Sequence, residues 1–206
     1  MRLYDITLPV RADTPVWPGD TPVEFHKNWE IEKGAAVNLG SVKMSFHTGT
    51  HTDSPFHTQN DGLDIASLEL SPYIGSARVI EIVGKSCIQK EDFHGVDFEL
   101  TPRILMKTGG WMTGTNFPER FPVMAPDVPE YLSFNGVVLI GLDSPSVDEF
   151  HSKDMANHLE LNRLNIRIIE SLNLEGVPEG IYELIALPLK LCGADGSPIR
   201  AILRTP

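Results

Sequence analysis

Short apolar runs, separated by polar turns, recur along most of the chain. They have the length and composition of strands, and they predict strands at residues 3–8, 37–46, 77–83, 104–107, 137–142, 166–169, 182–187 and 199–203. Apolar residues at near-helical spacing predict helices at residues 64–70, 126–134 and 153–164. Because strands outnumber helices, the pattern predicts an α/β fold with a mixed sheet and few helices.

The runs at residues 137–142 and 166–169 are almost continuously apolar, and the helix predicted at 153–164 lies between them. Strands of this kind are covered on both faces, so the pattern is typical of a βαβ unit. We therefore expect the active site near the ends of these strands. The Pro-rich segments 14–19 and 117–129 predict irregular loops, a kind of segment that often carries function.

The composition is that of an ordinary globular protein and narrows the range of partners. The 206 residues, 41% hydrophobic and 22% charged, fit a single domain over residues 1–206. A net charge of −11 without a basic stripe argues against nucleic acid. The start of the chain lacks a signal peptide's apolar core, and no run approaches the ~20 apolar residues of a membrane span. We therefore expect a cytoplasmic protein without a membrane partner.

Histidine and aspartate, rather than cysteine, supply the candidate metal ligands. Cys87 and Cys192 form no Cys-x-x-Cys pair, and we expect both to be inert core thiols. By contrast, three histidines and one aspartate fall within eleven residues, spaced His-x3-His-x-Asp-x3-His from His47 to His57. Imidazole and carboxylate groups without thiolate suit zinc or a neighbouring transition metal in a catalytic site. The alternative is a Thr-rich polar loop that binds no metal, but several candidate ligands at short spacing favour the metal.

The spacing also constrains the backbone of this segment. In a flat strand His47 and His51 would lie about 13 Å apart at ~3.3 Å per residue, too far to share one metal ion. Gly49 and Pro55 argue against a regular helix. We therefore predict a tight loop, in which Gly49 adopts a conformation that other residues resist. The spacing leaves open whether His57 is a further ligand or an acid.

The segment HTGTHTDSPFH at residues 47–57 resembles the signature of the cyclase-like metal hydrolases. Further segments resemble the bacterial kynurenine formamidase (arylformamidase) branch of that family, namely WPGDTP at 17–22, GLDSPSVD at 141–148 and ELIALPLKL at 183–191. Their order and spacing agree over essentially the whole chain. The resemblance implies a swivelling β/β/α-type fold, a homodimer, and hydrolysis of N-formyl-L-kynurenine to kynurenine and formate in tryptophan breakdown.

The resemblance also assigns roles to individual residues. It implies a binuclear centre of two Zn²⁺ ions per subunit, bridged by Asp53. The ligand set that it implies is His47, His51, Asp53, His158 and Glu170. It further implies that His57 is the proton donor and that Trp17 lies against the substrate. Manganese or another divalent ion is an alternative in vitro.

The residues themselves support these roles unevenly. Glu170 ends an apolar run, where a buried carboxylate is costly unless a cation or strong donors compensate it, and an ion pair with a basic neighbour is the alternative. His158 lies in the predicted helix 153–164, where a histidine is more often a surface or capping residue. Trp17 precedes Pro18 and Gly19, a pair that favours a type II turn and would hold the indole at a pocket mouth. Ordinary packing is the competing interpretation for Trp17.

The remaining tryptophans and histidines receive no catalytic role. We expect Trp29 and Trp111 to be structural or pocket-lining. We expect His94 and His151 to be exposed, and His26 stays unassigned.

Two alternatives to an arylformamidase share the ligand set. One is another hydrolase of the same family that opens a cyclic amide or lactone, such as isatin. The other is a non-catalytic metal-binding homologue, because fold and function are separable. The turn at residues 17–20 and the short chain favour the formamidase. Five candidate ligands together with His57 argue against a degenerate site.

Overall fold

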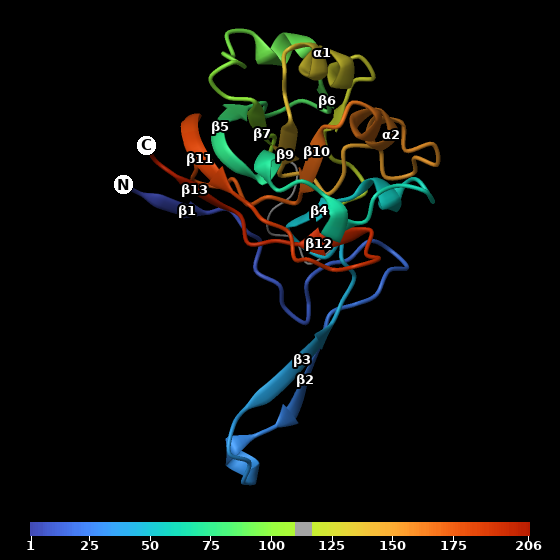
Figure 1. Cartoon of the computed structure of the whole chain (residues 1–206), viewed down its shortest axis with the longest axis vertical. Helices are drawn as coiled ribbons and strands as arrows, with labels where there is room; N and C mark the ends of the chain where they lie inside the picture. The colour runs from blue at the N-terminus through green and yellow to red at the C-terminus, as the bar shows by residue number, and fades with distance from the viewer. Residues whose placement is uncertain (110–116) are drawn as a thin grey trace.

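The computed structural model describes residues 1–109 and 117–206, so the prediction for Trp111 lies outside the described residues. Within the described part, nine strands form one curled sheet in the order β1-β13-β11-β5-β7-β9-β10-β4-β12 (Figure 1). The strands are β1 Leu3–Asp5, β4 His51–Asp53, β5 Ile74–Glu81, β7 Arg103–Lys107, β9 Leu139–Leu142, β10 Arg167–Glu170, β11 Gly180–Ile185, β12 Gly196–Pro198 and β13 Ile202–Arg204.

The middle of the sheet is parallel and its two sides are antiparallel. β5, β7, β9 and β10 pair in parallel. β4 and β12 on one side, and β11, β13 and β1 on the other, pair antiparallel. The helix α2 (Ala156–Arg163) connects β9 to β10, which confirms the predicted βαβ unit. The predicted α/β class with a mixed sheet is likewise confirmed.

The alternation of side chains along the strands builds two hydrophobic cores, one on each face of the sheet. Ile104 and Met106 of β7 belong to the core beneath α2 and the helix α1 (Val128–Phe134), whereas Leu105 between them belongs to the other core. Strands close this second core, since the outer part of the sheet contributes Leu184 and Leu203 to it. Helices on one face and curling strands on the other agree with the β/β/α-type fold that the resemblance implies.

The predicted and observed elements differ in several places. The helix predicted at 64–70 is wrong, because the segment holds only the 3-10 turn η3 (Ile65–Ser67), in which Asp64 accepts the Ser67 N–H. β4 and β12 were not predicted, because their sequences HTD and GSP carry no apolar pattern. The strand predicted at 37–46 is present as the shorter β3 (Leu39–Lys43) and lies outside the main sheet.

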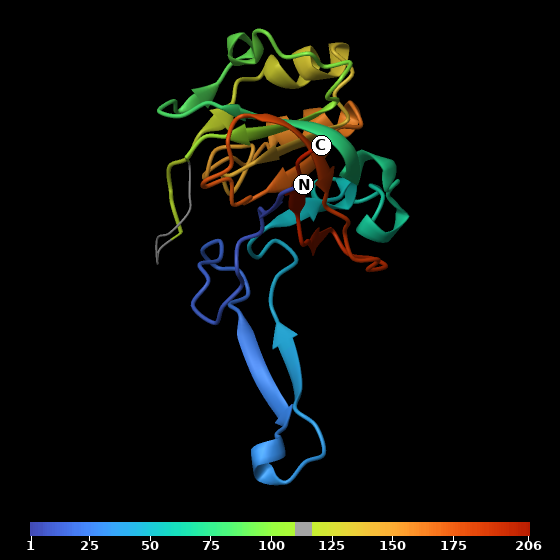
Figure 2. The same cartoon turned by 90° about the vertical axis from the view of Figure 1, so that its left-hand side faces the viewer.

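β3 belongs to an arm that projects from the body of the molecule (Figures 1 and 2). It pairs antiparallel with β2 (Glu24–Trp29), and the 3-10 turn η1 (Ile31–Lys33) follows β2. Every residue of β3 is exposed, and large hydrophobic side chains such as Phe25 and Val42 are exposed along the arm. With 58% of its surface exposed, Trp29 is neither a core residue nor part of the pocket described below.

The remaining described elements are short. β6 (Cys87–Ile88) pairs in parallel with β8 (Val123–Met124), and 3-10 turns form η2 (Pro55–His57), η4 (Ser71–Tyr73) and η5 (Lys90–Phe93). Cys87 is half-buried and Cys192 is exposed, so neither is the core thiol that was expected. None of the helices in residues 1–109 and 117–206 combines the length and the apolar character that a bilayer crossing needs.

Candidate metal centre

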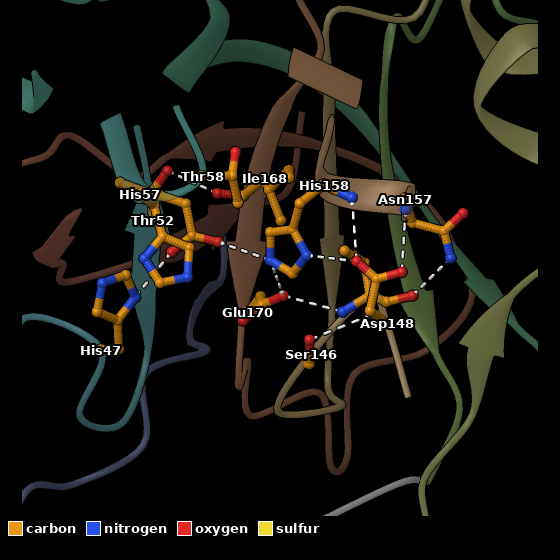
Figure 3. A network of polar contacts seen from close by, with 12 residues as sticks. His47, Thr52, His57, Thr58, Ser146, Asp148, Asn157, His158, Ile168 and Glu170 are labelled. Carbon is orange, nitrogen blue, oxygen red and sulfur yellow. Dashed lines mark hydrogen bonds and ion pairs between the residues drawn. The ribbon is translucent and has the colours of Figure 1, made fainter. Parts of the chain in front are cut away.

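The residues that the resemblance assigns as metal ligands meet where β4 pairs with β10. His47 lies in the turn before β4, and His51 and Asp53 are the first and last residues of β4. His158 lies on α2, and Glu170 ends β10 directly opposite His51. Figure 3 shows His47, His158 and Glu170 directed towards one region from these separate elements. The structure therefore brings all five candidate ligands together.

A tight turn places His47 next to His51. The Thr48 N–H donates to the Ser45 carbonyl at 3.3 Å, and Gly49 adopts the left-handed region with φ 67°. The two imidazole centroids consequently lie 4.9 Å apart. The predicted bend at Gly49 is confirmed. The prediction of a loop throughout is wrong, because residues 51–53 continue as a strand between β10 and β12.

The threonines between the histidines attach this segment to its neighbours. Thr50 donates its hydroxyl to the Ser171 carbonyl and Thr52 donates to the Ile168 carbonyl, both at 2.6 Å. Side chains alternate between the two faces of a strand. His51 is therefore left on the face that carries the cluster, while the hydroxyls fix the strand from the other side.

Asp53 lies at the centre of the cluster. Its Oδ1 is 3.0 Å from His47 Nδ1 and 3.3 Å from His51 Nε2, and its Oδ2 is 3.4 Å from His158 Nε2. Asp53 is 4% exposed, and neither carboxylate oxygen has an aligned hydrogen-bond partner among the described residues. A buried carboxylate whose oxygens lack aligned hydrogen bonds is costly, and a cation bound between these nitrogens and oxygens would compensate its charge. The donor set therefore fits a metal ion.

Glu170 and His158 complete the cluster. Glu170 Oε1 lies 3.4 Å from His158 Nε2, and Glu170 Oε2 lies 3.5 Å from His51 Nε2. The ligand atoms form two groups, each within 4.8 Å, and both groups include Asp53: His47 with His51 and Asp53, and Asp53 with His158 and Glu170. Nitrogen and oxygen donors in these numbers suit zinc and its neighbours in the periodic table.

A second contact fixes the direction of the histidine rings. Metal-ligating histidines usually donate their other N–H to a carboxylate or a carbonyl. His51 Nδ1 lies 2.9 Å from the Gly49 carbonyl. His158 Nδ1 lies 2.7 Å from Asp148 Oδ2, as Figure 3 shows. The Nε2 atoms of both rings are thereby turned towards the cluster.

His47 is held between Asp195 and β12. Its Nε2 donates to Asp195 Oδ2 at 2.9 Å, so its Nδ1 faces Asp53. The imidazole lies against Gly196, where a Cβ would come 2.9 Å from His47 Cε1 and 3.1 Å from the Thr52 carbonyl oxygen. The absence of a side chain at Gly196 is what leaves room for the ring.

We expect Gly196→Ala to displace His47 and to lower zinc affinity by about 10- to 100-fold, the range typical of changes that disturb ligand orientation. The added methyl group meets a rigid ring and a backbone carbonyl, so neither neighbour yields easily. Competition with a chromophoric chelator measures the affinity. An unchanged zinc affinity in folded Gly196→Ala protein would contradict this account of the packing.

Without an ion between them, the histidines of the cluster favour the protonated form. Burial lowers the pKa of His47, but contacts with Asp195 and Asp53 outweigh it and raise that pKa to about 9. Burial likewise lowers the pKa of His51, but Asp53 and Glu170 raise it to about 10. For Asp53, burial raises the pKa, and the surrounding histidines outweigh burial and hold it well below its usual range.

These pKa values predict that the stability of metal-free protein, prepared with a chelator, falls as the pH rises. The folded-state pKa values of about 9 and about 10 exceed the unfolded value of ~6.5, so the histidine contribution is complete below about pH 6.5 and is lost as the pH rises through about 9 to 10. We expect the Tm of chelated protein to fall between pH 7 and pH 10. The zinc-loaded protein should lack this fall, because ligation requires neutral imidazole. Thermal unfolding with chelator and with zinc tests this, and a rising Tm in chelator would contradict it.

A cavity of about 350 Å³ adjoins the cluster. Its polar lining includes His51, His57 and Glu170, and its apolar lining includes Trp17, Phe117 and Phe150. Trp17 stacks on Phe150 with centroids 4.8 Å apart and meets Phe117 edge-on at 5.0 Å. An aromatic wall beside polar groups suits a ligand that carries both an aryl ring and a polar reacting centre.

The predicted turn presents Trp17 to this pocket. The Asp20 N–H donates to the Trp17 carbonyl at 2.9 Å, and Gly19 has φ 93°, as a type II turn requires. The prediction of the turn is therefore confirmed. Contact between Trp17 and a substrate stays a prediction.

His57 faces the pocket from beside the candidate ligands. It ends the turn η2, and its ring centroid lies 4.2 Å from that of His47 and 5.8 Å from that of His158. Its Nδ1 lies 3.3 Å from Asp195 Oδ2, and 28% of its side chain is exposed. His57 is thus more accessible than the buried carboxylates.

Asp148, Phe150 and Asp195 also belong to the site, although their places in the sequence predict no role for them. Each is far from the histidine cluster in the sequence, so no local spacing marks it. His158 is 2% exposed, although a histidine at its helix position is more often at the surface. The other described histidines lie outside the cluster and are exposed, as expected for His94 and His151 and also for the unassigned His26.

Comparison with known proteins defines the class of this chain. Residues 4–149 match the model of a family described as "Putative cyclase". The chain therefore belongs to the cyclase family, as the resemblance of residues 47–57 indicates.

Individual relatives narrow the comparison further. Over 200 residues the chain is 46% identical to the kynurenine formamidase of Geobacillus thermodenitrificans, with 97% of this chain and 96% of that protein covered. A solved structure titled as a potential metal-dependent hydrolase with cyclase activity is 27% identical, with a TM-score of 0.84 over 98% of this chain and 96% of that one. Isatin hydrolase A from Labrenzia aggregata is 22% identical, with a TM-score of 0.80 over 98% and 93% of the two chains, and shares the fold.

Proposed function

We propose that this protein is a zinc-dependent arylformamidase that hydrolyses N-formyl-L-kynurenine to L-kynurenine and formate in cytoplasmic tryptophan breakdown. The observation that carries the proposal is an aromatic pocket that adjoins a buried cluster of nitrogen and oxygen ligands. An aryl group against Trp17 would leave its formamide beside the cluster. The 46% identity to a kynurenine formamidase supports this choice of substrate.

Two Zn²⁺ ions per subunit would account for the donor set. His47 and His51 face one oxygen of Asp53, and His158 faces the other. We therefore assign Asp53 as the bridging ligand and Glu170 as the fifth ligand. His47, His51, Asp53, His158 and Glu170 would hold this pair of divalent ions, which when bound would supply an activated water near neutral pH and a Lewis acid for the formyl oxygen.

His57 would supply the proton that the leaving group needs. Cleavage of the formamide C–N bond expels an arylamine nitrogen, which leaves poorly unless it is protonated. His57 lines the pocket beside His47 and His158. Because its Nδ1 contacts Asp195, its Nε2 is the nitrogen available to the substrate.

Turnover of N-formyl-L-kynurenine by the purified protein tests the proposal. Kynurenine formation is followed by absorbance with zinc, after chelation and after zinc is restored, and isatin serves as the comparison substrate. We expect hydrolysis of the formamide with zinc, its loss on chelation and its recovery. Opening of isatin without formamide hydrolysis would favour the cyclic-amide alternative, and zinc binding without either reaction would favour a non-catalytic homologue.

We further propose a homodimer in which the arm of each subunit packs against the other copy. An isolated two-stranded hairpin is marginally stable in water, and among the described residues β2 and β3 pair with each other alone. Yet Phe25, Trp29 and Val42 expose large apolar surfaces there. Exposed apolar patches of this kind mark protein interfaces, and a second copy of the chain is the partner that is always present.

Charges on the arm should dissociate this dimer. We expect the double variant Phe25→Asp and Trp29→Asp to raise the dimer dissociation constant by roughly 10²- to 10³-fold, as the loss of two large apolar anchors predicts. Light scattering after size-exclusion chromatography measures the mass. The matched control replaces Leu70 and Phe134, exposed hydrophobic residues outside the arm, by aspartate. A monomeric wild-type protein, or an arm variant as dimeric as the control, would refute the proposal.

A further inference from the structure

We propose that Asp195 is a positioning residue that orients His47 and His57 together through one carboxylate oxygen. Its Oδ2 lies 2.9 Å from His47 Nε2 and 3.3 Å from His57 Nδ1. The roles of the two histidines rest on the proposed function, whereas the contacts themselves do not. Asp195 thus joins a candidate ligand to the candidate acid.

The backbone fixes Asp195 relative to β4. Its carbonyl accepts the Ser54 N–H at 2.9 Å, and the next residue, Gly196, pairs with Asp53 in the β12–β4 register. The loop is tied at a second point by Asp64, whose Oδ2 accepts the Gly193 N–H at 2.6 Å. Asp195 therefore lies directly before β12, the strand that pairs with β4 and its candidate ligands His51 and Asp53.

The contact with Asp195 decides which nitrogen of each ring is left for chemistry. His47 donates its Nε2–H to Asp195, so its Nδ1, 3.0 Å from Asp53 Oδ1, is the nitrogen left to bind an ion. His57 donates its Nδ1–H, which leaves its Nε2 for the substrate. Carboxylates fix the tautomer and direction of imidazoles in this way in metal sites and in catalytic triads.

One shared oxygen also couples the two rings. Their centroids lie 4.2 Å apart with an interplanar angle of 38°, so neither ring turns freely without disturbing the other. The Asp195 side chain is 36% exposed, which sets it apart from the fully buried residues that the core requires. Loss of its carboxylate should therefore release both rings without unfolding the protein.

The same three side chains also lie close enough to share a metal ion, because their ligand atoms are within 4.8 Å of one another. That arrangement would make Asp195 a ligand rather than a positioning residue. Zinc stoichiometry separates the two roles. Loss of a ligand lowers the number of bound ions, whereas loss of a positioning residue leaves that number unchanged and weakens the affinity for each ion.

The test compares Asp195→Asn with Asp64→Asn, which loosens the same loop without touching either histidine. Zinc affinity and stoichiometry are measured by chelator competition, and the imidazole tautomers are read from ¹⁵N NMR spectra of histidine-labelled protein. Turnover of N-formyl-L-kynurenine is measured in the wild-type and His57→Ala backgrounds. If Asp195→Asn fails to fold, the same measurements are made on Asp195→Glu, which keeps the charge but moves the carboxylate.

We expect Asp195→Asn to weaken zinc binding by about 10- to 100-fold at unchanged stoichiometry and to shift the imidazole signals of two histidines. Asp64→Asn should do neither. Asp195→Asn should lower kcat in the wild-type background and have no further effect on kcat at saturating zinc in His57→Ala. The proposal would be overturned if Asp195→Asn left zinc affinity and the imidazole spectra unchanged, or if it lost one of the bound ions. It would also be overturned if Asp64→Asn changed zinc affinity and the spectra as much as Asp195→Asn does. The zinc and NMR results decide it even if the protein does not hydrolyse the formamide.

Discussion

Asp53→Asn is expected to remove bound zinc and formamidase activity together. The change keeps the shape of the side chain but replaces one carboxylate oxygen by an NH₂ group and removes the charge. Asp53 belongs to both candidate ligand groups, and its two oxygens face different histidines. No single substitution at another candidate ligand touches both groups in this way. Substitution of a residue that only supports a metal ligand lowers affinity or activity by up to roughly 100-fold. We therefore expect Asp53→Asn to lower zinc affinity and kcat/KM by more than this.

Metal analysis and kinetics on the same preparation check this expectation. Asp61→Asn is the matched control, because it removes the same charge from an exposed position on the following loop. It should retain both ions and full activity. An Asp53→Asn protein that keeps its zinc and its turnover would remove the basis for a bridging carboxylate.

The half of the site that lies within one segment was predictable from the sequence. His47, His51 and Asp53 fall within seven residues, so their spacing alone indicates a metal site. His158 and Glu170 reach the same point through the pairing of β10 with β4 and the packing of α2. Such pairing is decided between distant segments, and local periodicity does not encode it. These two residues were found through the family resemblance.

The same distinction applies to the fold. The apolar runs of β9 and β10 and the intervening helix were predicted because burial on both faces leaves a strong signal. β4 is also buried, but its residues are polar. Sheet pairing and the hydrogen bond from Thr52 to the Ile168 carbonyl hold this strand in place, rather than apolar contacts. The arm shows the reverse error, since hydrophobic residues at β3 predict a strand but do not reveal that the strand is exposed.

His57→Ala is expected to keep both zinc ions and to lose turnover of N-formyl-L-kynurenine by about 10²- to 10⁴-fold, the usual contribution of a general acid. The spacing of the sequence leaves the role of His57 open between ligand and acid. Its position favours the acid, because 28% of its side chain is exposed and it lines the pocket. His51, by contrast, is 2% exposed and faces Asp53 and Glu170. His51→Ala should therefore lose zinc as well as activity.

The leaving group provides the sharper test of the acid. An arylamine needs a proton as it departs, whereas a phenolate leaves without one. His57→Ala should therefore lose much less kcat/KM on an aryl formate ester than on the formamide, each compared with the wild-type protein. If His57 were instead a metal ligand, loss of an ion would lower the hydrolysis rates of both substrates to a similar extent. Equal losses on ester and formamide, together with reduced zinc content, would assign His57 to the metal.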